Sequence, residues 1–408
     1  MKQLRSRTLL TGSVALGLTL AACSSPAGDD RSAAPSAPSQ PSSCPADDAA
    51  RGAGPGGTPP SGAFPGGAPP SGAFPGGPPG GAPSGGADLS MATSVAPSDT
   101  STSKVITPSG PQIQCGKTPT ETHRDIVFAK PSSGGKAMQL MMDVLVPKTG
   151  GRKPLVVYLS GGGFQMASKE AGLDQRTYLA ESGYAVASIQ YRTIAVGAIY
   201  SDGVADVKSA IRYLRAHAAE YDIDPQKVAV YGESAGGYLS AMVGTTNGVK
   251  RFDTGGNLDQ SSAVQAVVDK FGPSDLSKVG ADFDDTARKA NTAPGNFLAQ
   301  WVFGPGTKKS VTADPAVVAR ANPVTYVDSS DPPFLLLHGS ADTLVSPSQT
   351  LLLHTALRAK SVDSTRYVLT GAGHGDLSFL GNAQAGQPWT TREVMDDIVT
   401  FLGEHLGG

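Results

Sequence analysis

From residue 118 to the end of the chain, short apolar runs alternate with amphipathic helical patterns, and this alternation constrains the fold most. Residues 155–159 (LVVYL) and 228–231 (VAVY) are apolar throughout, as strands buried on both faces are. Between them, Val204, Val207 and Ile211 recur at helical spacing. The pattern predicts a mainly parallel, doubly wound α/β sheet flanked by helices over residues 118–408. The predicted strands are 123–128 and 138–146 (a hairpin), 155–159, 184–189, 228–231, 264–271, 334–337 and 366–369, and the main helices are 175–182, 202–220, 351–358 and 392–406.

The preceding residues, 24–117, show almost no such alternation. Within them, the window 51–90 holds 24 Gly or Pro in 40 positions and repeats the decapeptide PPSGAFPGG(A/P). Glycine raises the entropy of the unfolded chain and proline lacks a backbone N–H donor, so this composition cannot build a packed core. Residues 24–117 are therefore predicted to be a disordered linker that tethers the domain.

The first 23 residues have the pattern of a bacterial export signal. Three basic residues precede an apolar stretch over 9–20, which is too short to span a bilayer comfortably. The stretch ends in Leu-Ala-Ala-Cys at 20–23, which resembles the lipobox whose cysteine is lipidated. The alternative is an ordinary secretory signal cut near Ala22. Either signal predicts an extracytoplasmic protein, and the lipobox predicts a lipid anchor at Cys23 that holds it to the outer face of the cell membrane.

Charge and cysteine content exclude several classes of protein. A net charge of −2 over 408 residues does not suit binding to nucleic acid through phosphate neutralisation. Besides Cys23 only Cys44 and Cys115 remain, which in an oxidising compartment either pair or stay free. No His, Cys and Asp cluster has the spacing of metal ligands, so neither a metal nor another cofactor is expected. The oligomeric state stays open.

A serine lies in a sharp turn between a predicted strand and a predicted helix. The strand 228–231 runs into Gly-Glu-Ser-Ala-Gly-Gly over 232–237, which places Gly-x-Ser-x-Gly in the strand–turn–helix context that a nucleophile needs. The turn exposes the Ser234 hydroxyl at a helix amino terminus, where the helix dipole favours developing negative charge. Ser234 is therefore the predicted nucleophile, rather than part of a glycine-rich structural turn.

A serine hydroxyl needs a base to take its proton. Of six histidines, His374 alone is both late in the chain and in a glycine-rich loop after a strand, Gly-Ala-Gly-His-Gly at 371–375. His338 ends the predicted strand 334–337, and the others fall in predicted helices or open the first strand. His374 is the predicted general base and acid.

A carboxylate should orient that histidine by accepting a hydrogen bond from it. Asp342 follows a strand end and gives the chain order Ser234, Asp342, His374, which is that of the α/β-hydrolases. Asp275, after the strand 264–271, is the alternative, whereas Asp376 lies very near His374 in sequence.

Acyl transfer also requires hydrogen-bond donors for an oxyanion. The backbone N–H of Ala235, directly after the nucleophile, is one expected donor. The loop Ser-Gly-Gly-Gly-Phe at 160–164 follows the strand 155–159, and its backbone N–H groups can approach a ligand closely. A merely flexible glycine loop is the alternative.

Residues 120–406 together resemble the α/β-hydrolase esterases with an HGGG-type oxyanion loop, and most closely the bacterial feruloyl/acetyl-xylan esterase-like (BD-FAE-like) branch. The resemblance implies the α/β-hydrolase fold, the triad Ser234, Asp342 and His374, and oxyanion donors at Gly162, Gly163 and Ala235. The family commonly has histidine where this chain has Ser160. The matching stretches are GYAVASIQYR (183–192), the helix start at 206–210, IDPQKVAVYGESAGG (223–237), AVQAVVDKFGPSDL (263–276) and DPPFLLLHGSADTLV (331–345).

These features predict a serine carboxylic-ester hydrolase acting on a short-chain, acetyl or feruloyl-type ester, either a small molecule or linked to polysaccharide. A prolyl-oligopeptidase-like peptidase shares the triad order, but no propeller-like repeat precedes residue 120. A catalytically inactive surface-binding lipoprotein on the same scaffold is the alternative from another class. Residues 276–322 separate two core strands, and their aromatic side chains either line an acyl pocket or form the core of that insertion.

Overall fold

The computed structural model describes residues 42–45, 91–375 and 386–407. The chain divides into two units, Met1–Ser39 and Gln40–Gly408, and all the described residues belong to the second. The export signal with Cys23, and the glycine- and proline-rich window 51–90, lie outside the described residues. Within the described ranges, no helix combines the length and apolar character needed to cross a bilayer.

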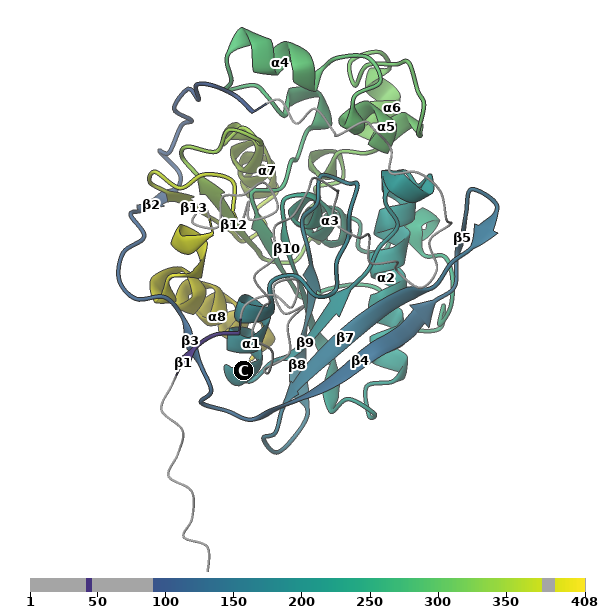
Figure 1. Ribbon diagram of the computed structural model, residues 1–408, viewed down its shortest axis with the longest axis vertical. Helices are drawn as coiled ribbons and strands as arrows, with labels where there is room; N and C mark the ends of the chain where they lie inside the picture. The colour runs from purple at the N-terminus through teal and green to yellow at the C-terminus, as the bar shows by residue number, and fades with distance from the viewer. Residues whose placement is uncertain (1–41, 46–90, 376–385, 408) are drawn as a thin grey trace, which may run out of the picture. The chain divides into compact units, whose positions relative to one another are not determined.

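In the described part of the chain, a nine-stranded sheet forms the centre of the domain (Figure 1). Its order is β2-β13-β12-β11-β10-β8-β9-β7-β4. The strands from β2 to β9 in this order are parallel, and β7 and β4 are antiparallel to their neighbours. The bounds are β2 Lys104–Ile106, β4 Thr120–Ala129, β7 Leu140–Pro147, β8 Lys153–Leu159, β9 Ala185–Ile189, β10 Ile223–Glu233, β11 Ala266–Lys270, β12 Phe334–Gly339 and β13 Ser364–Leu369, with the two-residue strands β1 Ser42–Ser43, β3 Gln114–Cys115, β5 Ser132–Ser133 and β6 Lys136–Ala137 outside the sheet.

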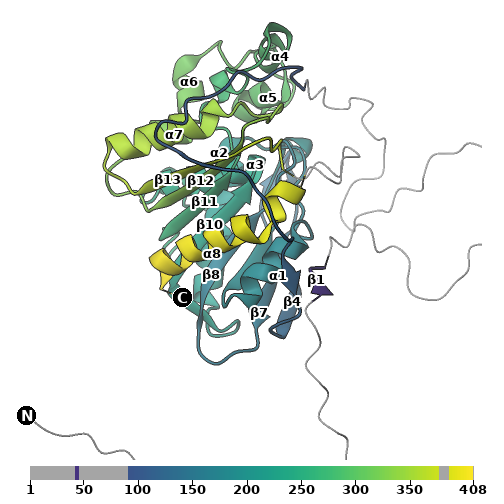
Figure 2. The same ribbon diagram turned by 90° about the vertical axis from the view of Figure 1, so that its left-hand side faces the viewer.

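Two hydrophobic cores cover the two faces of this sheet (Figure 2). Helices α2, α3 and α7 pack against one face, and α1 and α8 pack against the other. This layering confirms the predicted doubly wound sheet, and the predicted hairpin is the antiparallel pair β4 and β7. The helices are α1 Leu173–Glu181, α2 Tyr200–Ala216, α3 Ala235–Thr245, α4 Asp285–Asn291, α5 Phe297–Phe303, α6 Pro315–Ala319, α7 Ser348–Ala359 and α8 Arg392–Leu406.

The domain begins earlier than the predicted boundary at residue 118. Residues 91–117 pack on it, and β2 adds a parallel edge strand beside β13. The fully buried guanidinium of Arg366 holds this segment by donating to the Ser98 and Ser103 hydroxyls and to the Asp99 carbonyl. This corrects the predicted extent of the linker. The segment shows no hydrophobic periodicity because only separate apolar residues such as Ile106 and Ile113 are buried, and polar contacts from a distant strand help to fix its path.

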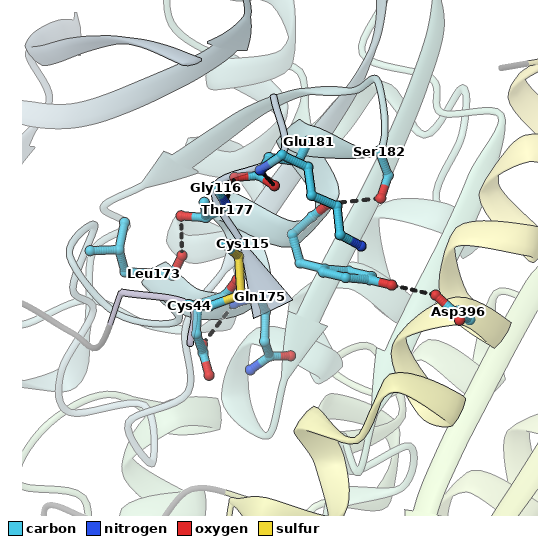
Figure 3. The surroundings of a disulfide bond; sticks show 12 residues. Cys44, Cys115, Gly116, Leu173, Gln175, Thr177, Glu181, Ser182 and Asp396 are labelled. Atoms are coloured by element: carbon cyan, nitrogen blue, oxygen red, sulfur yellow. Dashed lines mark hydrogen bonds between the residues drawn. A yellow bond between two sulfur atoms is a disulfide. The ribbon is translucent and has the colours of Figure 1, made fainter. Parts of the chain in front are cut away.

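A disulfide joins Cys44 to Cys115 across 71 residues of sequence (Figure 3). Their short strands β1 and β3 pair antiparallel. Beside the bridge, the Glu181 carboxylate of α1 accepts the N–H groups of Gly116 and Lys117 at 2.6 and 3.0 Å. The bridge, which the sequence left open, therefore fastens residues 42–45 to the side of the domain that carries α1.

Candidate active site

Ser234 occupies the predicted sharp turn between β10 and α3. Its backbone has φ 55° and ψ −117°, which is left-handed and strained for a residue with a side chain. The turn is held by the Ser234 N–H, which donates to the Lys270 carbonyl at 2.9 Å. A Cβ on Gly236 would lie 2.0 Å from the Leu159 carbonyl oxygen, so only glycine fits there. The tight packing explains why the motif needs small residues beside the serine.

Ser234, His374 and Asp342 form a continuous hydrogen-bonded chain at the carboxyl ends of β10, β12 and β13. His374 Nε2 lies 2.8 Å from Ser234 Oγ, and His374 Nδ1 lies 2.7 Å from Asp342 Oδ2. The other carboxylate oxygen, Oδ1, accepts the N–H groups of Leu344 and Val345, each at 2.9 Å. The structure thus brings together the three residues that the sequence predicted as a triad, in the geometry that deprotonating a serine requires.

The Asp342 side chain is completely buried, and its surroundings favour the charged form. Burial alone raises the pKa of Asp342, but the facing His374 and hydrogen bonds from His338 and His374 outweigh it. The net effect holds the pKa of this carboxyl well below its usual range. Asp342 therefore stays ionised at neutral pH and can stabilise a charged imidazole.

The alternative carboxylate, Asp275, is engaged elsewhere. Its Oδ1 accepts from the backbone and hydroxyl of Ser277 and from the Asn322 amide, and its Oδ2 lies 3.0 Å from Lys278 Nζ. These contacts make Asp275 the cap of a short 3₁₀ turn. The structure places Asp342, and not Asp275, against His374.

The remaining histidines contact other parts of the protein. His338 is completely buried, and its Nε2 lies 3.2 Å from Asp342 Oδ2, a contact that its position at a strand end did not predict. Asp376 lies outside the described residues. His123 contacts Glu121, and His217 contacts the Tyr213 carbonyl. His354 contacts Ser364 and the Thr102 carbonyl, and His405 contacts Asp363.

The glycine loop after β8 lies directly against Ser234. A Cβ on Gly161 would lie 3.3 Å from the Cβ of Ser234. Among the described residues, the N–H groups of Gly162, Gly163 and Ala235 have no hydrogen-bond acceptor. These backbone N–H groups can therefore donate hydrogen bonds to an oxygen atom of a ligand bound at Ser234.

Ser160, which stands where the resembled family commonly has histidine, fixes the start of this loop. Its hydroxyl accepts the N–H of Ser168 at 3.0 Å, and its carbonyl accepts the Tyr191 hydroxyl at 2.7 Å. The two bonds tie the start of the loop to Ser168 and to Tyr191, which follows β9, so a serine here can order the loop without an imidazole.

The glycine loop ends at Phe164, whose ring belongs to a cluster of aromatic side chains. Phe164 stacks on Trp301 with ring centroids 4.8 Å apart, and Tyr238 meets Phe164 edge to face at 5.2 Å. All three are buried. Residues 276–322 carry α4, α5 and α6 in a group beyond one end of the sheet (Figure 1). Of the aromatic residues there, Trp301 and Phe283 are buried and Phe297 and Phe303 pack, partly buried, against the core.

A buried ion pair lies directly before the nucleophile. Lys270 Nζ is 2.6 Å from Glu233 Oε1, and Gln175 of α1 bonds to both side chains. Although burial raises the pKa of Glu233, the charge of Lys270 and the hydrogen bonds that Glu233 accepts hold it below the usual value. Because Lys270 also offers its carbonyl to the Ser234 N–H, this pair fixes both sides of the turn.

His374 is supported from behind by two aromatic rings. The Phe271 ring centroid lies 4.7 Å from that of His374, and Trp389 packs on Phe271 at 4.6 Å. The Trp389 Nε1–H donates to the Gly373 carbonyl at 3.3 Å. The histidine loop is therefore held by packing as well as by Asp342.

Sequence reasoning missed Lys270, Glu233 and His338 as parts of the site. A signal existed for one of them, since AVVDKF (266–271) places adjacent charges inside an apolar strand. Such charges are rarely buried unless paired. In the parts of the chain that the structure describes, no His, Cys, Asp and Glu side chains gather in threes as metal ligands do.

The fold and the site can be compared with known proteins. A model of the BD-FAE family matches residues 142–357, more than half of the 408-residue chain. The chain belongs to the BD-FAE family. Ser234, the glycine loop at 160–164 and Asp342 fall inside the matched region, whereas His374 follows it.

Among curated relatives of this BD-FAE chain, the esterase LipC of Mycobacterium tuberculosis (strain ATCC 25618 / H37Rv) is 30% identical over 235 residues, which cover 57% of this chain and 55% of LipC. The chain spans about half the length of the curated relatives it matches.

Solved structures agree on the fold. A truncated carbohydrate esterase from gut microbiota has a TM-score of 0.59 and 27% identity, over 71% of this chain and 97% of that one. The thermophilic esterase Est2 of the Planctomycetes species Thermogutta terrifontis, solved with butyrate bound, has a TM-score of 0.52 and 25% identity, over 70% of this chain and 94% of that one. These neighbours confirm the predicted α/β-hydrolase fold.

Proposed function

We propose that this BD-FAE chain is a serine carboxylic-ester hydrolase that forms an acyl-enzyme on Ser234. One observation carries the proposal: a serine on a strained strand–helix turn is hydrogen-bonded to a histidine that is hydrogen-bonded to a buried carboxylate. The names of the similar proteins, esterases in each case, support the same chemistry.

The acylation step follows from the positions of these atoms. His374 Nε2 takes the proton from Ser234 Oγ as that oxygen attacks the ester carbonyl carbon, and its Nδ1–H stays hydrogen-bonded to Asp342. The carbonyl oxygen becomes an oxyanion and accepts N–H groups of Gly162, Gly163 and Ala235. His374 then gives its proton to the departing alkoxide, which leaves as an alcohol.

Deacylation repeats the same steps with water. His374 takes a proton from a water molecule, whose oxygen attacks the acyl carbon and releases the carboxylic acid from Ser234. Ser234 recovers its proton from His374. No metal or other cofactor takes part in either half of this scheme.

The substrate we propose is an ester with a short acyl group, such as an acetyl ester, free or carried on a polysaccharide. The rings of Phe164, Trp301 and Tyr238 are buried and pack against one another, so they belong to the core of the domain. The butyrate-bound Est2 and the carbohydrate esterase among the similar structures support the same class.

The location we propose is the outer face of the cell membrane, with a lipid anchor at Cys23. The Cys44–Cys115 disulfide supports export, because such bonds persist in oxidising compartments. A Cys23→Ser variant should lose the mass of the lipid and move from the membrane fraction to the medium. An unchanged mass and fractionation would reject the anchor.

Ester turnover tests the proposed activity. p-Nitrophenyl acetate, butyrate and octanoate, a feruloyl ester, acetylated xylan and a prolyl peptide form the panel. We expect the acetate or butyrate ester to be hydrolysed fastest, and Ser234→Ala to lower kcat by about 10⁴-fold or more. The exposed Ser109, changed to Ala, is the matched control and should keep full activity. Turnover that survives in Ser234→Ala would reject the nucleophile, and cleavage of the peptide alone would make the chain a peptidase.

A further inference from the structure

The buried carboxylate of Asp342 contacts two histidines. His374 Nδ1 lies 2.7 Å from Asp342 Oδ2, and His338 Nε2 lies 3.2 Å from the same oxygen. His338 and Asp342 are both completely buried. His338 lies near the end of β12, and Asp342 follows that strand in sequence. The acyl-transfer scheme gives His338 no task.

The other contacts of His338 determine which of its nitrogens carries a proton. Nε2 faces the Val345 carbonyl oxygen at 2.9 Å as well as the Asp342 carboxylate, and neither oxygen can donate. Nε2 must therefore be the protonated nitrogen. The Nε2–H group therefore donates toward both the Val345 carbonyl oxygen and the Asp342 carboxylate.

Hydrogen bonds also hold the Nδ1 edge of the His338 ring. His338 Nδ1 lies 3.1 Å from Thr350 Oγ1, and that hydroxyl oxygen accepts the Nε–H of Arg366 at 3.0 Å. The Thr350 hydroxyl proton has two acceptors within reach, the Pro347 carbonyl at 3.4 Å and His338 Nδ1 at 3.1 Å. Because Nδ1 carries no proton when Nε2 does, it is the nearer acceptor and takes the Thr350 hydrogen bond. The bonds then run in one direction, from Arg366 through Thr350 and His338 to Asp342.

Arg366 is itself fixed on several sides. Its Nη2 donates to the Pro347 carbonyl at 2.8 Å, and its Nη1 donates to the Ser103 hydroxyl at 2.7 Å. The guanidinium is completely buried between β13, the start of α7 and the segment 91–106. The chain of hydrogen bonds therefore begins at a cation that the fold holds rigidly.

We propose that His338, held by Thr350 and Arg366, is a positioning residue that fixes Asp342 for His374. The inference rests on the proposed function, because it gives His338 its task through the triad. Asp342 Oδ1 is held by the Leu344 and Val345 N–H groups, and His338 restrains Oδ2. With both oxygens restrained, the carboxylate cannot rotate, and the imidazole of His374 stays aligned with Ser234.

Two His338 variants separate positioning from simple packing. His338→Leu keeps bulk but removes both nitrogens, whereas His338→Gln places an amide N–H where Nε2 was. The matched control is His354→Leu, because His354 is also buried, lies one helical turn after Thr350 on α7 and hydrogen-bonds to Ser364 and the Thr102 carbonyl rather than to the triad. Thr350→Val is a second, nearly isosteric break in the chain of hydrogen bonds.

The measurements are kcat and KM on the best ester of the panel, and the downfield proton NMR resonance of the His374 Nδ1–H donated to Asp342. We expect His338→Leu to lower kcat about tenfold to hundredfold with KM within twofold of wild type. His338→Gln should recover most of the loss, and Thr350→Val should lie between Gln and Leu. The NMR resonance should shift or broaden in His338→Leu and not in His354→Leu.

Equal kcat in His338→Leu and His354→Leu, or an unchanged His374 resonance in His338→Leu, would overturn the proposal. If His338→Leu fails to fold, the same comparison is made between Thr350→Val and His354→Leu, with the same two outcomes. The resonance does not depend on turnover. A wild-type protein inactive on every ester would therefore reject the proposed function, while the NMR comparison would still decide whether His338 positions Asp342.

Discussion

Two adjacent residues of β11, Asp269 and Lys270, point to opposite faces of the sheet beneath the nucleophile, and both are completely buried. Lys270 enters the core covered by α1 and α8, where Glu233 and Gln175 contact its ammonium group at 2.6 and 2.9 Å. Asp269 enters the core covered by α2 and α3. There Oδ1 accepts the Gly272 N–H at 2.8 Å, and Oδ2 has no partner among the described residues.

The two buried groups differ in the contacts that replace their lost water. The Lys270 ammonium contacts the Glu233 carboxylate and the Gln175 amide oxygen. The Asp269 carboxyl lacks such compensation, and burial raises its pKa to about 7. One face of the sheet therefore contains an ion pair that supports the Ser234 turn, and the other contains a carboxyl that holds its proton in acid.

The largest expected effect comes from breaking the ion pair. Lys270→Met leaves the Glu233 carboxylate buried without its cation, which should lower the free energy of unfolding by about 3–5 kcal/mol. Urea denaturation measures the loss. In Lys270→Met/Glu233→Gln the unpaired charge is gone, so the double variant should recover part of it. Equal destabilisation of the single and double variants would show that packing, and not the unpaired charge, accounts for the loss.

The disulfide on the α1 side should have the next largest effect. Replacing Cys44 and Cys115 together with Ser frees residues 42–45 and should lower the free energy of unfolding by about 2–4 kcal/mol. Because neither cysteine contacts Ser234, His374 or Asp342, kcat at 25 °C should stay within about twofold. Thermal denaturation and ester turnover measure the two quantities, with Cys23→Ser as the control that keeps the bridge. A large fall in kcat would show that the bridge reaches the site through α1.

The smallest expected effect, taken per pH unit, concerns Asp269. The folded protein holds the Asp269 proton up to about pH 7, whereas an unfolded chain releases it near the ordinary aspartate pKa of about 4. Between these values the unfolded state binds fewer protons, so this group lowers the stability of the fold as pH rises from about 4 to 7, by on the order of 1 kcal/mol per pH unit. Asp269→Asn should remove that slope. Urea midpoints at pH 5, 6 and 7 test this, and parallel slopes in the two proteins would contradict the assignment.

The sequence predicted the framework well because its signals there are local. An apolar run such as 155–159 shows a buried strand, and Gly-x-Ser-x-Gly after 228–231 shows a tight turn, whatever the rest of the chain does. The sequence predicts linker for the segment 91–117 because its partners lie far away in the chain; Arg366, for example, is more than 250 residues from Ser98 and Ser103. No local pattern records such a partner.

The choice of orienting carboxylate shows the same limit. Asp342 and Asp275 both follow strand ends, and sequence position favoured Asp342 through chain order without excluding Asp275. In the structure Ser277, Asn322 and Lys278 engage Asp275, whereas Asp342 faces His374. Which carboxylate meets the histidine depends on β12 lying beside β13, which is a property of the assembled sheet.

The sequence by itself determined the alternation of strands and helices, the strained turn at Ser234 and the glycine loops around it, because these depend on neighbouring residues and on the backbone freedom of glycine. Only the tertiary structure decided which distant side chains meet: Lys270 with Glu233, Arg366 with the segment 91–106, and His338 with Asp342. Those contacts need strands and loops from separate parts of the chain to pack side by side. Their energies come from burial that exists only once the sheet has formed.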